Sequence, residues 1–169
     1  MKNNTSKSVI QIPKLLQSLS TLSRFKVGSH IDLDVDQQRI DVRHWSRYCL
    51  HCIRRFGDAQ VQTELVNIGY GRVMSMSFCT AGGNGEEQDV EIKIGLSQIS
   101  DFLKALRKGR NVSFQVLLLR LRRTVEQIEE EGANEEIDVQ MMNKENQWNI
   151  KSWANDTKEA TLNRFIHKH

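Results

Sequence analysis

The strictest alternation of apolar and polar residues along the chain lies between residues 29 and 36. There Ile31, Leu33 and Val35 are separated by polar residues, as in a strand with one buried face. Shorter apolar runs bounded by turn residues predict five more strands, at residues 61–68, 73–79, 89–94, 136–142 and 148–153. The last two are close enough in sequence to form a hairpin.

Apolar residues spaced by three and four predict helices elsewhere. Leu15, Leu16, Leu19 and Leu22 indicate a short amphipathic helix that packs on its own domain or binds a partner or a membrane surface. Further helices are predicted at three places: Trp45 to Phe56 with an end near Gly57, Leu96 to Leu106, and a terminal helix that begins at Asp156.

The helix from Trp45 to Phe56 has the clearest pattern of all. Its apolar stripe is expected to face the core, and Cys49 and Cys52 are therefore expected to be buried thiols. The stripe comprises Trp45, Tyr48, Cys49, Cys52, Ile53 and Phe56. Residues 112–128 fit both a strand and a helix, and we favour a strand to about residue 121.

Helices interspersed with runs of strands predict an α+β fold with a mainly antiparallel sheet and three or four helices. We expect a mobile basic N-terminal segment with the amphipathic helix at residues 1–25, followed by a single compact α+β domain at residues 26–169. A chain of 169 residues is long enough for one sizeable core.

Composition favours a folded, well-solvated chain, with 38% hydrophobic and 27% charged residues. Residues 1–14 have no continuous apolar region, so we expect no secretory signal, and no apolar run approaches the ~20 residues of a membrane span. Three cysteines, an odd number, favour a reducing compartment. We therefore expect an intracellular, cytoplasmic protein, with peripheral membrane attachment as an alternative.

No catalytic, metal or cofactor site is predicted. Cys49 and Cys52 form only one pair of potential zinc ligands, whereas a structural zinc site needs four ligands. The pair lies within a helix and not at its N-terminus, where a redox cysteine pair would be activated. Because no set of nucleophile, base and stabilising group stands out, we expect a protein that is not an enzyme.

Charge is the most informative functional signal. The net charge is only +3, yet basic residues cluster in three groups, and acidic residues gather separately between residues 126 and 138. Arginine-rich clusters suit phosphate groups, which guanidinium binds with paired hydrogen bonds. The predicted polyanion-binding residues are Arg43, Arg47, Arg54, Arg55, Lys104, Arg107, Lys108, Arg110, Arg120, Arg122 and Arg123.

These features predict a non-enzymatic binding and assembly protein that self-associates and engages RNA, a ribonucleoprotein or an anionic membrane. The layout is broadly similar to that of small matrix or accessory structural proteins of RNA viruses, a similarity of layout from which no residue role follows. A regulatory adaptor that binds another protein is the alternative, followed by a thiol- or metal-dependent enzyme.

Overall fold

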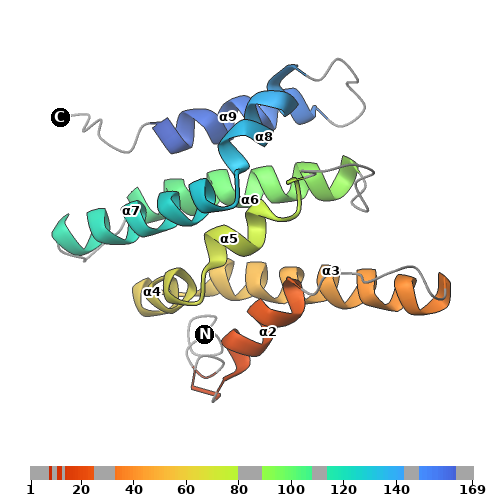
Figure 1. Ribbon diagram of the computed structural model, residues 1–169. Coiled ribbons are helices and arrows are strands. Elements are labelled where there is room, and N and C mark those ends of the chain that lie inside the picture. The colour runs from red at the N-terminus through yellow and green to blue at the C-terminus, as the bar shows by residue number, and fades with distance from the viewer. Residues whose placement is uncertain are drawn as a thin grey trace. The chain divides into compact units, whose positions relative to one another are not determined.

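The computed structural model describes residues 8, 11–12, 14–24, 33–79, 89–107, 114–142 and 149–162. Within these ranges the chain forms eight α-helices and no strand (Figure 1). The predicted α+β fold with an antiparallel sheet is therefore wrong. Residues 1–7, 9–10, 13 and 25 of the N-terminal segment predicted to be mobile lie outside the described residues. So do residues 143–147, between the two strands of the predicted hairpin.

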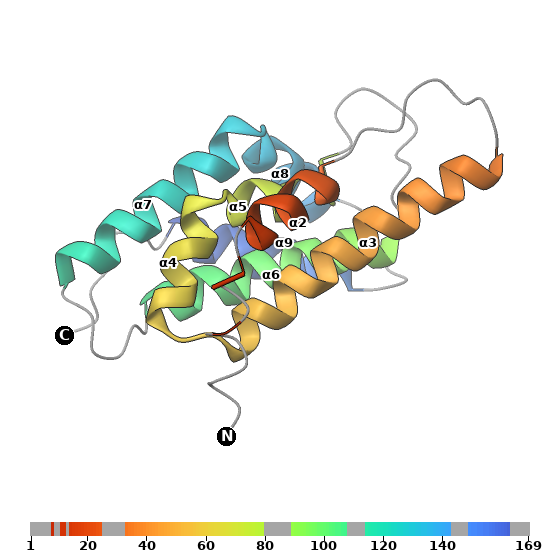
Figure 2. The same cartoon turned by 90° about the horizontal axis from the view of Figure 1, so that it is seen from below.

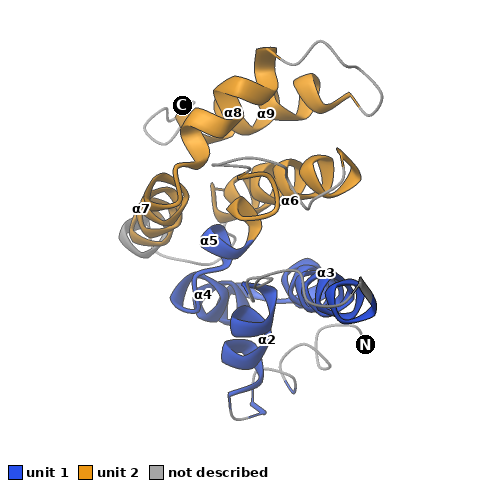
Figure 3. Cartoon of the chain, turned by 45° about the vertical axis from the view of Figure 1, so that its right-hand side comes forward, with its two compact units in different colours: residues 1–73 blue, residues 74–169 orange. Residues whose placement is uncertain are grey.

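The chain divides into two compact units, residues 1–73 and residues 74–169 (Figure 3). Unit 1 contains α2 (Leu15–Ser23), α3 (Leu33–Phe56), α4 (Ala59–Asn67) and most of α5 (Tyr70–Ser75). Unit 2 contains α6 (Asp89–Arg107), α7 (Phe114–Glu130), α8 (Ala133–Met142) and α9 (Ile150–Leu162). The predicted helix at the leucine segment is confirmed as α2.

Helix α3 begins twelve residues before the predicted helix, at Leu33, so the expected strand at residues 29–36 is wrong for its described part. Asp34 and Asp36 lie in the first turn and Arg54 and Arg55 in the last, where each charge offsets the partial charge of its helix end. The predicted end near Gly57 is confirmed, because α3 ends at Phe56.

Two helices replace the strands predicted at residues 61–68 and 73–79. Asp58 caps the first turn of α4 by accepting hydrogen bonds from the backbone N–H groups of Gln60 (3.0 Å) and Val61 (3.1 Å). Gly69, with a φ of 81°, provides the left-handed turn between α4 and α5. The Asp58 cap and the Gly69 turn thus explain where α4 begins and where it is joined to α5.

In unit 2, α6 joins the predicted strand at residues 89–94 to the helix predicted after it. Helix α7 resolves the ambiguous segment as helix, contrary to the favoured strand, and α8 and α9 replace the predicted hairpin. The terminal helix begins at Ile150 rather than Asp156. Gly132 has a φ of 68° and provides the sharp turn between α7 and α8.

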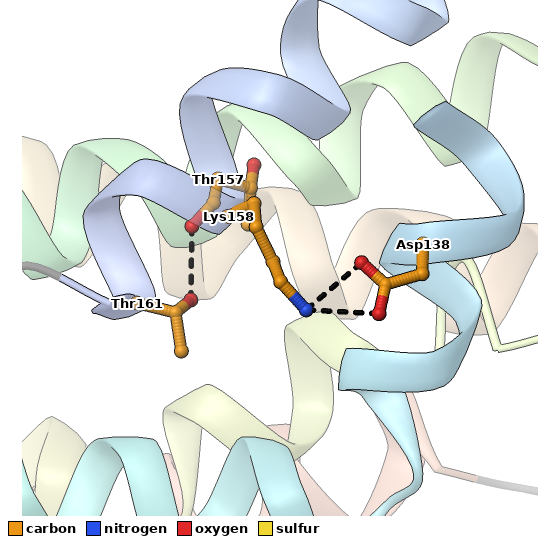
Figure 4. A network of polar contacts seen from close by, with 4 residues as sticks. All are labelled: Asp138, Thr157, Lys158 and Thr161. Carbon is orange, nitrogen blue, oxygen red and sulfur yellow. Dashed lines mark hydrogen bonds and ion pairs between the residues drawn. The ribbon is translucent and has the colours of Figure 1, made fainter. Parts of the chain in front are cut away.

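The core of unit 2 forms where α6 packs against α7 and α9 and where α8 packs against α7 and α9. Leu96, Phe102 and Leu103 of α6 are fully buried. The Thr157 hydroxyl on α9 lies 2.9 Å from the Leu96 carbonyl oxygen and 2.7 Å from that of Trp153. The Thr161 hydroxyl donates to the Thr157 carbonyl at 2.9 Å (Figure 4). A polar contact therefore fixes α9 against α6 inside an apolar core.

The core of unit 1 is built by α2, α3 and α4 around Leu50, Val61 and Leu65, all fully buried. Helix α2 lies against α3 (Figure 2), and the Ser20 hydroxyl on α2 donates to the Ile68 carbonyl at 3.0 Å. These contacts position α2 and α3 for the surface described next.

Candidate functional site

One face of α3 exposes a row of large apolar side chains. Trp45, the largest of them, is 60% exposed. The row, which we call the α3 face, comprises Val35, Val42, Trp45, Tyr48, Cys49 and Phe56. Scattered exposed apolar residues are normal in proteins, but a row of them along one side of a helix is typical of an interaction surface.

Most of the stripe predicted to face the core does not, because Trp45, Tyr48, Cys49 and Phe56 are exposed. Ile53 of that stripe is buried as predicted, together with Leu50 and Arg47, which is only 5% exposed. Cys49 is accordingly exposed and Cys52 half-buried, so the prediction of two buried thiols is also wrong. The helix is amphipathic as predicted, but most of the predicted core stripe lies on its exposed side.

The exposed residues follow a heptad repeat. Val35, Val42, Cys49 and Phe56 are each seven residues apart. Trp45 and Cys52 occupy the intervening positions, three residues after Val42 and Cys49, and Gln38 occupies the corresponding first position. Apolar residues at the a and d positions of successive heptads form the contact line between paired helices in coiled coils. The heptad spacing is visible in the sequence, but spacing alone does not show whether these residues face the core or a partner.

The aromatic residues at the centre of the α3 face are arranged edge to face. The ring centroids of Trp45 and Tyr48 are 5.8 Å apart with an interplanar angle of 88°, and His44 contacts Trp45 in the same way at 5.2 Å. At the end of the helix, the Arg55 guanidinium lies 5.8 Å from the centroid of the Phe56 ring. Such contacts hold the rings in place and lower the entropy lost when a partner binds.

A groove of about 280 Å³ runs beside the α3 face in unit 1. Leu19 of α2 forms one wall, and the other lining residues come from α3: Asp41, Val42, Trp45, Ser46 and Cys49. Figure 2 shows the two helices side by side. The groove is shallow and open, and its lining is mainly apolar.

The predicted partner-binding leucines have different environments in α2. Leu16 is buried, Leu15 and Leu19 are half-buried, and Leu22 is exposed. Helix α2 therefore packs on its own unit through Leu16 while Leu19 contributes to the groove.

The predicted polyanion-binding residues of α3 lie in unit 1. Arg43 and Arg47 are buried, Arg54 is half-buried and Arg55 is exposed. Burial of the first two leaves them little access to a polyanion.

The remaining predicted basic residues belong to unit 2. Lys104, Arg122 and Arg123 are exposed, and Arg122 pairs with Glu126 at 2.8 Å. Arg107 donates to the Ala160 carbonyl, which ties α6 to α9, and burial lowers the pKa of its guanidinium. Burial likewise lowers the pKa of Arg120. Lys108 and Arg110 lie outside the described residues.

Among the residues that the structure describes, no group of three or more His, Cys, Asp or Glu side chains is arranged to hold a metal ion. Cys79 is half-buried, and burial, followed by the negative charges of Glu136, Glu131 and Glu135, raises the pKa of its thiol to about 12. The thiol is therefore protonated at neutral pH, the form that is not nucleophilic.

No helix in the described ranges has both the length and the apolar composition needed to cross a lipid bilayer. Comparisons with protein-family models, with curated proteins and with solved structures found no match.

Proposed function

We propose that the protein is a non-enzymatic binding and assembly protein that docks an amphipathic helix of another chain on the α3 face. The observation that carries this proposal is the exposure of Trp45 in the middle of a heptad repeat of apolar residues. Helix-in-groove recognition uses such anchors at helical spacing, and large aromatic residues dominate the binding energy of such interfaces.

The groove supports the proposal because it provides a depression beside the apolar row, where a side chain of a partner could lie. A partner helix laid along α3 would place one side chain between Leu19 and Val42, where it loses contact with water on both sides. Each methylene group buried there contributes about 0.8 kcal/mol. We assign this activity to the cytoplasm, because the three cysteines are free thiols, as expected in a reducing compartment.

A synthetic probe tests this function without knowledge of the natural partner. The probe is a fluorescein-labelled 24-residue amphipathic peptide with leucine at the heptad a and d positions, held at nanomolar concentration so that it does not pair with itself. We expect its fluorescence anisotropy to rise on titration with the protein. Trp45→Glu should weaken binding at least tenfold, because a charge then occupies the centre of the apolar contact.

The matched control is Val139→Glu, since Val139 on α8 is also 60% exposed but is not part of the α3 face. This variant should bind the peptide like the wild type. Equal binding by the wild type and Trp45→Glu, or no binding by the wild type, would contradict the proposal. Circular dichroism of each variant establishes that the helices are retained.

A second candidate function is polyanion binding by unit 2. It is favoured by the exposure of the neighbouring Arg122 and Arg123 on α7. Phosphate contacts release counterions, so binding of single-stranded RNA should weaken steeply with salt and show little sequence preference. Replacing both arginines by Gln should reduce the affinity and the salt dependence, whereas Lys151→Gln on α9 should change neither.

Absence of binding to RNA and to anionic vesicles at low salt would exclude this second function. It would leave the docking function on α3 unaffected, because that function depends on apolar contacts in unit 1.

A further inference from the structure

We propose that the helix that docks on the α3 face is α3 of a second copy of the chain, oriented antiparallel to the first. This inference rests on the proposed docking function and names its partner. It follows from the distribution of charge along α3 and from the position of the heptad repeat.

The exposed charges of α3 change sign along its length. The first half carries exposed Asp34 and Asp41, whereas Arg55 is exposed in the last turn. Of the two arginines in the first half, Arg39 forms an ion pair with Asp36 at 3.4 Å and Arg43 is buried. An antiparallel copy brings the acidic end of each helix to the basic end of the other, whereas a parallel copy would bring like charges together.

This distribution is self-complementary, which is the property that an isologous twofold interface requires. The helix macrodipoles also favour the antiparallel orientation, because the N-terminus of each helix then lies beside the C-terminus of the other. Helix α3 has 24 residues and is therefore about 36 Å long, which is long enough for an extended helix-to-helix contact.

The heptad repeat fixes the register of the pair. In an antiparallel coiled coil, an a residue of one helix packs against a d residue of the other. Pairing Val42 with Trp45 of the second copy satisfies this rule at the centre of the helix. The same register brings Val35 to Cys52 of the second copy and Asp34 beside its Arg55, so apolar and charged contacts agree.

Disulfide trapping tests the orientation. The test protein carries Val35→Cys, Cys49→Ser and Cys79→Ala and retains Cys52, so its two thiols are 17 residues apart on one helix and cannot join within a chain. Under mild oxidation we expect a covalent dimer linked between residue 35 of one copy and Cys52 of the other, identified by mass spectrometry. The chain with Val139→Cys in place of Val35→Cys is the control and should not form such a dimer.

A Cys52 to Cys52 disulfide as the main product would overturn the antiparallel orientation, since those residues meet only when the helices are parallel. If neither disulfide forms and sedimentation at millimolar concentration gives the mass of a monomer, the proposed self-pairing is wrong. The heptad-peptide measurement separates the two proposals. A monomeric chain that binds the peptide through Trp45 retains the docking function and loses this inference.

Charge reversal supplies a second, independent measurement. Asp34→Arg and Arg55→Asp should each weaken the dimer about fivefold in sedimentation equilibrium, as expected for two exposed ion pairs per dimer. The double variant should restore the wild-type dissociation constant, because the pair is rebuilt with its signs exchanged. A double variant that is weaker than both single variants would overturn the proposed register.

Discussion

Lys158 of α9 forms a bidentate ion pair with Asp138 of α8, with its Nζ 2.8 Å from Oδ1 and 2.9 Å from Oδ2 (Figure 4). The pair joins two helices that are also packed together in unit 2. It lies at the surface, because about half of the Asp138 side chain is exposed. Water and salt therefore screen the attraction.

Lys158→Ala should lower the free energy of unfolding by no more than about 1 kcal/mol, since exposed ion pairs contribute little. Urea denaturation at low and high salt measures the effect, and the difference between variant and wild type should shrink as salt is added. Arg122→Ala, which removes the exposed pair with Glu126 within α7, is a matched control with a similar small effect. A loss of several kcal/mol would contradict the surface character of the pair.

Gly95→Ala should destabilise unit 2 despite the higher helix propensity of alanine. A Cβ atom at residue 95 would lie 1.8 Å from the Ser77 hydroxyl oxygen and 3.1 Å from the Met74 carbonyl oxygen. Overpacking of this kind costs about 1 to 3 kcal/mol, which exceeds the propensity gain of up to ~1 kcal/mol. Chemical denaturation measures the change.

Ser77→Gly should partly rescue Gly95→Ala, because it removes the atom closest to the new methyl group. A Gly95→Ala protein as stable as the wild type would mean that α6 does not approach Ser77 as closely as the structure shows.

Leu50→Ala should lower the stability much more than Trp45→Ala, although both residues belong to α3. Leu50 is fully buried, so its truncation should cost about 2 to 5 kcal/mol. Trp45 is exposed, so its truncation should change the stability of the dilute protein by no more than about 0.5 kcal/mol. Thermal and urea unfolding at micromolar concentration measure both, and a large loss for Trp45→Ala would show that the α3 face is part of a core.

Cys79 should make stability fall at alkaline pH. Its folded-state pKa of about 12 exceeds the usual thiol value of 9.0, because burial and the nearby carboxylates oppose the thiolate. The unfolded chain therefore loses this proton first as the pH rises above 9, and stability contributed by the protonated thiol is full below pH 9 and is lost progressively toward pH 12. Cys79→Ala should show a shallower decline than the wild type in urea unfolding between pH 8 and pH 10.5. Equal slopes would contradict the raised pKa.

The sequence predicted the helices of α2 and the second half of α3 because their apolar residues recur at unambiguous helical spacing. It failed for α4 because Val61 and Leu65, four residues apart, lie on one face of a strand as well as of a helix. In α6, Val90, Ile92 and Ile94 alternate as in a strand, yet only Ile92 of the three is buried. Apolar residues two or four positions apart do not distinguish a strand from a helix. The capping residue Asp58 was the stronger indication of a helix.

The α3 face could be found from the sequence as a stripe, but its exposure could not. Charged side chains normally mark the solvent side of a helix, and this rule assigned Arg43 and Arg47 to the surface. In the structure both are buried while Trp45 is exposed. The heptad spacing from Val35 to Phe56 was the available sign that this stripe differs from an ordinary core stripe.

The exposed thiol of Cys49 makes the α3 face accessible to chemical modification. The thiol is exposed and lines the groove between Leu19 and Trp45, so a thiol-reactive molecule with a small apolar body would be held by the groove while it forms a bond with the sulfur. Such a molecule would cover the centre of the heptad line without altering the buried side of α3. A single covalent modification would thereby block docking on this surface. The time and the amount of reagent added would then control assembly.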